Sequence, residues 1–134
     1  MRVVIDTNVL ISAIFWTGRP KQILNKVRRE EITFLTSEFI LEELRKVLRR
    51  GDKPFKLSEE EADHVVTAMR DLAVVVNIGS QVSACQDEND NRVLECAIDG
   101  NADCIITGDF HLLQLGSFQE IEIMTVADFL GNPS

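Results

Sequence analysis

Short apolar runs rich in β-branched residues alternate along this chain with longer segments of helical periodicity. The apolar runs, which we expect to be strands, lie at residues 3–5, 32–36, 73–76, 104–107 and 121–124. Helical spacing follows most of these runs, and strands that are joined through helices lie parallel in a sheet. The pattern therefore predicts an α/β fold in which helices cover both faces of a parallel sheet.

The helical segments carry recognisable start signals. Ser37 is suited to cap a helix that reaches about residue 50, and Ser58 with Glu61 forms a capping box. Further helices are expected at residues 7–14, from Pro20 onward, at 90–99 and after Thr125. No repeat or linker interrupts the pattern, so we expect a single domain over residues 1–134.

Charge is divided unevenly along the chain, whose formal net charge is −8. Residues 1–56 hold 12 basic and 7 acidic side chains, whereas residues 57–134 hold 2 basic and 15 acidic side chains. An acidic total argues against a protein that coats DNA without specificity. The division still allows a basic surface beside an acidic site.

Two acids follow apolar strands directly. Asp6 ends the first strand, and Asp109 comes just after the fourth strand and Gly108. The carboxyl ends of parallel strands meet at one edge of a sheet, which is where ligands bind in open α/β folds. The alternative is that each carboxylate merely caps the next helix, since Asp is a favoured N-cap residue.

Two further acids come from helices. Glu43 falls between Phe39 and Val47 on an apolar helical stripe, where an unpaired carboxylate is costly. Asp90 is expected at the start of the helix over residues 90–99. The alternatives are that Glu43 lies at a rim and reaches solvent or an Arg, and that Asp90 is a plain N-cap.

The four acids Asp6, Glu43, Asp90 and Asp109 would repel one another if they met without a cation. No Lys or Arg is obviously placed to neutralise them. Hard oxygen ligands suit Mg²⁺ or Mn²⁺, as one or two ions. Such a site activates water and binds a phosphoryl oxygen, so the residues indicate metal-assisted hydrolysis of a phosphodiester.

Basic residues gather where the helix that starts near Ser37 ends: Arg45, Lys46, Arg49, Arg50 and Lys53. One interpretation is that they attract an RNA backbone. The alternative is a solvated helix face, with cations favoured by the helix dipole. His64 and His111 lack the spacing of metal ligands, although His111 follows Asp109 closely enough to touch a substrate.

Targeting signals are not evident in the sequence. No apolar run approaches the roughly 20 residues that span a bilayer, and Asp6 interrupts any signal-peptide core. The three cysteines form no Cys-x-x-Cys pair, which argues against a zinc site. We therefore expect a cytoplasmic protein that does not contact membranes.

Four segments, in this order, resemble the motifs of the PIN-domain nucleases. They are VIDTNVL at 4–10, TSE at 36–38 with EL at 43–44, DENDN at 87–91 with Ala97, and ADCIITGD at 102–109. The resemblance covers nearly the whole chain. One departure is Glu88, where related sequences often carry Pro.

The resemblance implies a three-layer α/β/α fold with a five-stranded parallel sheet and a Mg²⁺- or Mn²⁺-dependent endoribonuclease acting on single-stranded RNA. Metal binding and catalysis would fall to the four acids already named. Thr7, Asn8 and Thr107 would support them, as could Asp87. Many small members that resemble this chain are toxins of toxin–antitoxin pairs and form homodimers, which would make an antitoxin protein a partner.

Other functions would need other residues. A phosphate-receiver domain needs a late Lys, but no Lys follows Lys56. A haloacid-dehalogenase-type phosphatase needs a second Asp two residues after the first, where this chain has Asn8. The remaining rival is a PIN fold that serves only as a binding or scaffold module, and the presence of all four acids argues against it.

Overall fold

The structure is a computed structural model that describes residues 1–50 and 56–131. Its strands are β1 (Arg2–Ile5), β2 (Thr33–Thr36), β3 (Val74–Val75), β4 (Cys104–Ile106), β5 (Ser117–Phe118) and β6 (Ile121–Met124). Its helices are α1 (Thr7–Phe15), α2 (Arg19–Arg28), α3 (Glu38–Leu48), α4 (Glu59–Leu72), α5 (Glu88–Asp99), α6 (Phe110–Leu115) and α7 (Val126–Phe129). The predicted α/β architecture is confirmed.

The sheet has six strands in the order β3-β2-β1-β4-β6-β5. Neighbouring strands run parallel except for β5, which is antiparallel to β6. The expected count of five strands was therefore wrong by one. Strand β5 has two residues, too few for a periodic signal, and the turn after it depends on positive φ angles at Gln119 and Glu120.

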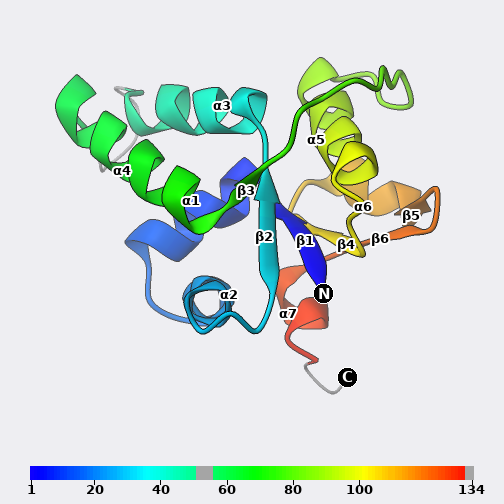
Figure 1. Cartoon of the computed structure of the whole chain (residues 1–134), viewed down its shortest axis with the longest axis horizontal. Helices are drawn as coiled ribbons and strands as arrows, with labels where there is room; N and C mark the ends of the chain where they lie inside the picture. Colours follow the sequence, from blue (N-terminus) through cyan, green and yellow to red (C-terminus); the bar gives the residue numbers. More distant parts are fainter. Residues whose placement is uncertain (51–55, 132–134) are drawn as a thin grey trace.

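Strand β1 lies at the centre of the sheet. Val4 pairs with Leu35 of β2 on one side and Ile105 of β4 on the other, and all three are fully buried. Figure 1 shows α1 and α2 on one side of the sheet and α5 and α6 on the other. Burial on both faces explains why the central strands are continuous apolar runs.

Two helices differ from their expected positions. Helix α6 was not foreseen, because six residues are too few to show a helical period. Helix α5 begins at Glu88, so Asp90 lies in its first turn and is not its cap.

Within the described residues, no helix combines the length and apolar character needed to cross a membrane.

Candidate active site

The first two polar groups of the site come from the carboxyl ends of β1 and β4. Ile5 pairs with Ile106, so Asp6 and Thr107 leave the sheet side by side. The Thr107 hydroxyl donates a hydrogen bond of 2.7 Å to one oxygen of Asp6, and the Thr7 backbone N–H donates to the other at 2.8 Å. Asp6 is 8% exposed and is held in one orientation.

Asp109 follows from the same strand end. Its backbone N–H donates to the Thr107 hydroxyl at 3.0 Å. One oxygen of Asp109 accepts from the N–H groups of His111 and Leu112 and so caps α6. The capping alternative is therefore correct for this oxygen of Asp109.

Helix α3 brings Glu43 to the same place. The Ser37 hydroxyl caps the helix by accepting from the Ile40 N–H at 3.2 Å. Glu43 is half-buried, and it lines a cavity together with Phe39 and Val47. Phe39 was expected on the core-facing stripe but is 41% exposed, because it lines this cavity and does not pack in the core.

Helix α5 supplies Asp90. The cap of this helix is Asp87, whose side chain accepts from the Asn89 N–H at 2.9 Å. Asp90 lies in the first turn, three residues after this cap, and is 5% exposed. Its Oδ2 is buried and has no hydrogen-bond partner, which is unusual for a carboxylate oxygen. The N-cap alternative for Asp90 was therefore wrong.

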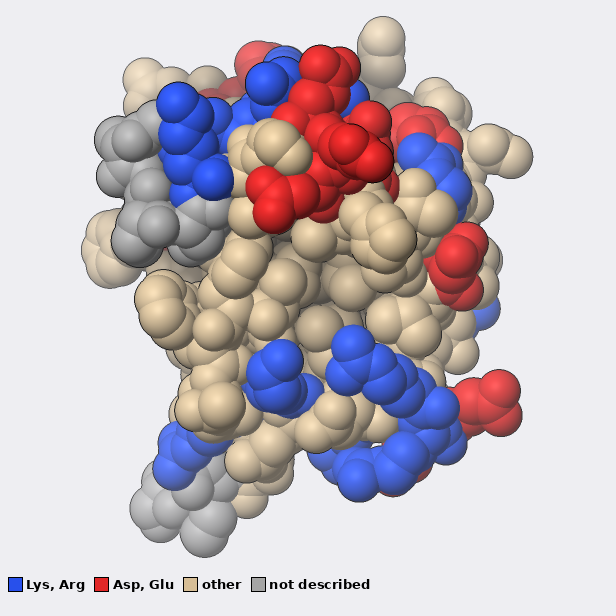
Figure 2. All heavy atoms as spheres, turned by 90° about the vertical axis from the view of Figure 1, so that its left-hand side faces the viewer, with Lys and Arg blue, Asp and Glu red and all other residues tan. Residues whose placement is uncertain are grey.

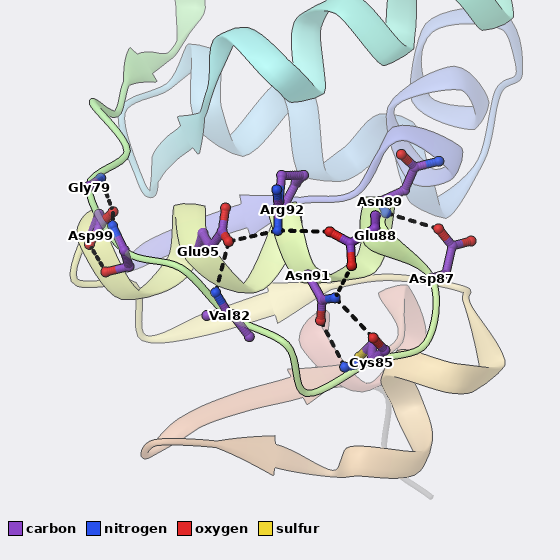
Figure 3. A network of polar contacts seen from close by, with 11 residues as sticks. Gly79, Val82, Cys85, Asp87, Glu88, Asn89, Asn91, Arg92, Glu95 and Asp99 are labelled. Atoms are coloured by element: carbon purple, nitrogen blue, oxygen red, sulfur yellow. Dashed lines mark hydrogen bonds and ion pairs between the residues drawn. The ribbon is translucent and has the colours of Figure 1, made fainter.

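Residues 77–86, which we call the strap, run along α5 towards Asp87. Figure 3 shows polar side chains of the helix holding the strap. The Asn91 side chain accepts from the Cys85 N–H at 2.8 Å and donates to the Cys85 carbonyl at 2.9 Å. One turn further on, the Glu95 carboxylate accepts from the Val82 N–H at 2.9 Å.

The far end of the strap is held in the same way. Asp99 accepts from the backbone N–H groups of Gly79 and Ser80 at 2.7 and 2.9 Å. The three helix residues that hold the strap are four positions apart, so they lie on one face of α5. The backbone beside Asp87 is therefore fixed by polar contacts and not by regular strand pairing.

A cavity of about 180 Å³, which we call the acid cavity, opens where these elements meet. It is lined by Asp6, Thr7, Asn8, Glu43, Arg50, Asp87, Asp90 and Asp109, all named from the sequence, together with other residues. Thr107 is not among the lining residues and acts on the cavity through Asp6. Among the described residues that line it, Arg50 is the only Lys or Arg.

Burial and mutual repulsion make two of these acids hard to ionise. Burial, together with the smaller effect of the charges of Asp109, Asp87 and Asp6, raises the pKa of Asp90 to about 6. Burial also raises the pKa of Asp6, against the hydrogen bonds from Thr107 and Thr7. A bound cation would relieve both penalties.

The donor set suits a hard divalent ion. Within residues 1–50 and 56–131, no three Asp, Glu, His or Cys side chains lie close enough together to hold a metal ion by themselves. Mg²⁺ does not need three protein ligands, because it commonly takes one or two carboxylates and keeps several waters. The unpartnered Oδ2 of Asp90 is the kind of oxygen such an ion would bind.

The basic residues at the end of α3 do not all face this cavity. Arg45 forms ion pairs with Asp63 and Glu59 of α4, and Lys46 and Arg49 are exposed outside the cavity lining. Figure 2 shows basic and acidic side chains interleaved on this upper part of the molecule. Lys53 lies outside the described residues.

Comparison with known families agrees with this geometry. The model of the PIN domain matches residues 2–111. The chain belongs to the PIN-domain family. Members of this family are generally metal-dependent nucleases. A relative of this PIN domain is an uncharacterized protein, MJ1680 of Methanocaldococcus jannaschii, which is 36% identical over 117 residues, or 86% of this chain and 75% of that protein.

Solved structures share the fold of this PIN domain. One is VapBC2 from Rickettsia felis, bound to a DNA fragment from its promoter, with a TM-score of 0.66 and 15% identity over 93% of this chain and 98% of the other. Another is VapBC-1 from nontypeable Haemophilus influenzae, with a TM-score of 0.66 and 18% identity over 95% of this chain and 99% of the other. At these identities the likeness extends to the fold alone.

Proposed function

We propose that this PIN domain is a metal-dependent endoribonuclease that hydrolyses phosphodiester bonds of single-stranded RNA. The observation that carries the proposal is the buried, unpartnered carboxylate oxygen of Asp90 in a cavity that four other acids also line. Asp6, Glu43, Asp90 and Asp109 are the metal-binding and catalytic residues in this proposal. The fold alone would not assign them.

The acids have different tasks in this proposal. A bound Mg²⁺ or Mn²⁺, as one or two ions, would lower the pKa of a water and polarise a phosphoryl oxygen. Asp6 and Asp90 present oxygens from fixed positions, because Thr107 and the first turn of α5 hold them. Thr7, Asn8 and Asp87 line the cavity around these oxygens and support them.

Arg50 is the basic residue best placed to meet the RNA backbone. It lines the acid cavity, whereas Arg45 is paired with acids of α4. Among the described basic residues of this group, we therefore assign Arg50 the closest phosphate contact and give Lys46 and Arg49 a more distant, screened attraction. Lys53, which lies outside the described residues, stays a predicted contact to the RNA backbone. Arg45 contributes least, because its charge is already compensated.

We also propose that this chain is the toxin of a toxin–antitoxin pair in the cytoplasm and acts as a homodimer or a higher oligomer. The support is the fold shared with two VapBC proteins. Induced expression should arrest cell growth, and co-expression of an adjacent antitoxin gene should restore it. Growth that is unaffected by the wild-type chain would contradict the toxin role without touching the nuclease chemistry.

The nuclease proposal is tested with end-labelled single-stranded RNA in Mn²⁺ or Mg²⁺. We expect cleavage by the wild type, none with EDTA, and a loss of at least about 100-fold in Asp6→Asn and Asp90→Asn. Asp71→Asn, which changes an exposed acid on α4, is the matched control and should cleave normally. Equal cleavage by all four proteins would mean contamination and would refute the site assignment.

The second function is a binding or scaffold module that keeps the fold without the chemistry. It is favoured by the absence, within the described part of the chain, of a ready-made three-residue metal cage. Binding of Mn²⁺ without RNA cleavage would support this alternative. Binding and cleavage that are lost together in Asp90→Asn would exclude it.

A further inference from the structure

A second cavity lies beside the acid cavity and shares two of its walls. It measures about 470 Å³ and includes Asp87 and Asp90, which also line the acid cavity. Its other walls are strap residues 84–86 and three residues of α6, namely His111, Gln114 and Leu115. A chain whose phosphate lies in the acid cavity can therefore extend directly into the second one.

The strap wall of this cavity is held in place before any ligand arrives. Asn91 is fully buried and bonds both the N–H and the carbonyl of Cys85, and its amide also lies 3.3 Å from a Glu88 oxygen. Figure 3 shows these contacts converging on the strap beside Cys85. Preformed walls are typical of cavities that bind small rings, because little ordering entropy is lost on binding.

The lining chemistry suits a flat, uncharged ring with polar edges. No Lys or Arg is among the described residues that line this cavity, so it has no cation to hold a second phosphate. Gln86 and Gln114 offer amides that both donate and accept. His111 is the aromatic residue of the described lining, and its ring and that of Phe110 form a T-shaped pair, with centroids 5.9 Å apart and planes at 68°.

We propose that this second cavity is a nucleobase subsite, which binds a base of the RNA strand next to the phosphate held in the acid cavity. The base stacks on His111, and the amides of Gln86 and Gln114 contact its edge. Single-stranded RNA is read in this way, by stacking on aromatic rings and hydrogen bonding to base edges. The subsite rests on the proposed nuclease function and adds a preference for the base beside the cut.

The test uses the ¹⁵N-labelled full chain in Mg²⁺, titrated with AMP, GMP, CMP, UMP and ribose 5-phosphate. We expect at least one nucleotide to shift the amide signals of Cys85 and Gln114 and to bind about five-fold or more tightly than ribose 5-phosphate. His111→Ala and Gln114→Ala should lose that gain. His64→Ala and Gln22→Ala, matched changes at exposed sites on other helices, should keep it.

Two results would overturn the subsite. Nucleotides and ribose 5-phosphate that shift the same signals with equal affinity would mean that only the phosphate binds. If no nucleotide shifts the amide signals of Cys85 or Gln114, then no base binds in this cavity and the subsite is refuted. RNA cleavage in Mn²⁺, measured separately, distinguishes the two failures, because cleavage that persists without a nucleotide response refutes the subsite alone.

Discussion

The Thr107 hydroxyl donates to Asp6 at 2.7 Å and accepts from the Asp109 N–H at 3.0 Å, so it joins two strand-end acids. We expect Thr107→Val to lower Mn²⁺ affinity and cleavage by about 10- to 100-fold, because Asp6 loses the bond that orients it. Calorimetric titration with Mn²⁺ and a cleavage assay measure the two effects. Thr107→Ser keeps the hydroxyl and should remain close to wild type; a Ser variant as impaired as Val would contradict this role.

Asp90 should make the metal-free protein less stable as pH rises. Its carboxyl pKa is raised to about 6, so the folded state holds the proton more tightly than the unfolded state does. This contribution to the free energy of unfolding is complete below about pH 4 and is lost by about pH 6, at a cost of up to about 3 kcal/mol. Urea unfolding in EDTA across this range measures it.

The matching variant is Asp90→Asn, which cannot ionise. We expect it to be more stable than the wild type at pH 7.5 in EDTA, to differ little from it near pH 4, and to bind Mn²⁺ poorly at either pH. Asp71→Asn, at an exposed position, should not differ from the wild type in stability at either pH. A lower stability of Asp90→Asn at pH 7.5 would show that the carboxylate is not strained in the metal-free protein.

Glu95 should be important for stability although it lies outside the acid cavity. It is 3% exposed, accepts from the Val82 N–H and pairs with Arg92 at 2.9 Å. Glu95→Ala leaves the Val82 N–H unpaired and removes one of the two carboxylates at Arg92, which keeps Glu88 at 3.2 Å. It should cost about 1–3 kcal/mol in urea unfolding. Glu95→Gln can still accept from Val82 and should cost clearly less, and equal losses in the two variants would exclude the strap contact as the cause.

Gly100 should not tolerate a side chain. A Cβ atom there would lie 2.9 Å from the Cys96 carbonyl and from a Val76 methyl, and 3.0 Å from a Leu35 methyl. We expect Gly100→Ala to lower the free energy of unfolding by about 1–3 kcal/mol. Gly79→Ala, where a Cβ atom meets nothing within 4 Å, is the control and should change stability far less.

The strands and the strand-end acids could be predicted because their signals are local. Apolar runs marked β1, β2, β4 and β6, and the parallel topology then placed Asp6 and Asp109 at one edge. Helical periodicity likewise placed Glu43 on the inner side of α3, where it lines the acid cavity. These inferences needed only the period of the pattern and the rule for parallel strand ends.

The strap and the second cavity could not be predicted in the same way. Residues 77–86 have no period, and their contacts depend on which face of α5 they cross. A signal was nevertheless present, because Asn91, Glu95 and Asp99 form a polar row four residues apart on a helix whose other face is apolar. A polar row opposite an apolar face is also typical of a helix side that meets water, so the row alone does not predict the strap.

Both edges of the sheet have consequences for how copies of this chain could assemble. The edge strands β3 and β5 have two residues each, so each offers very little unpaired backbone to a neighbouring sheet. Short edge strands protect a protein against edge-to-edge pairing of its sheet with the sheets of other copies, which would build extended sheets and fibres. Self-association of this chain is therefore expected to use helix surfaces and not the pairing of edge strands.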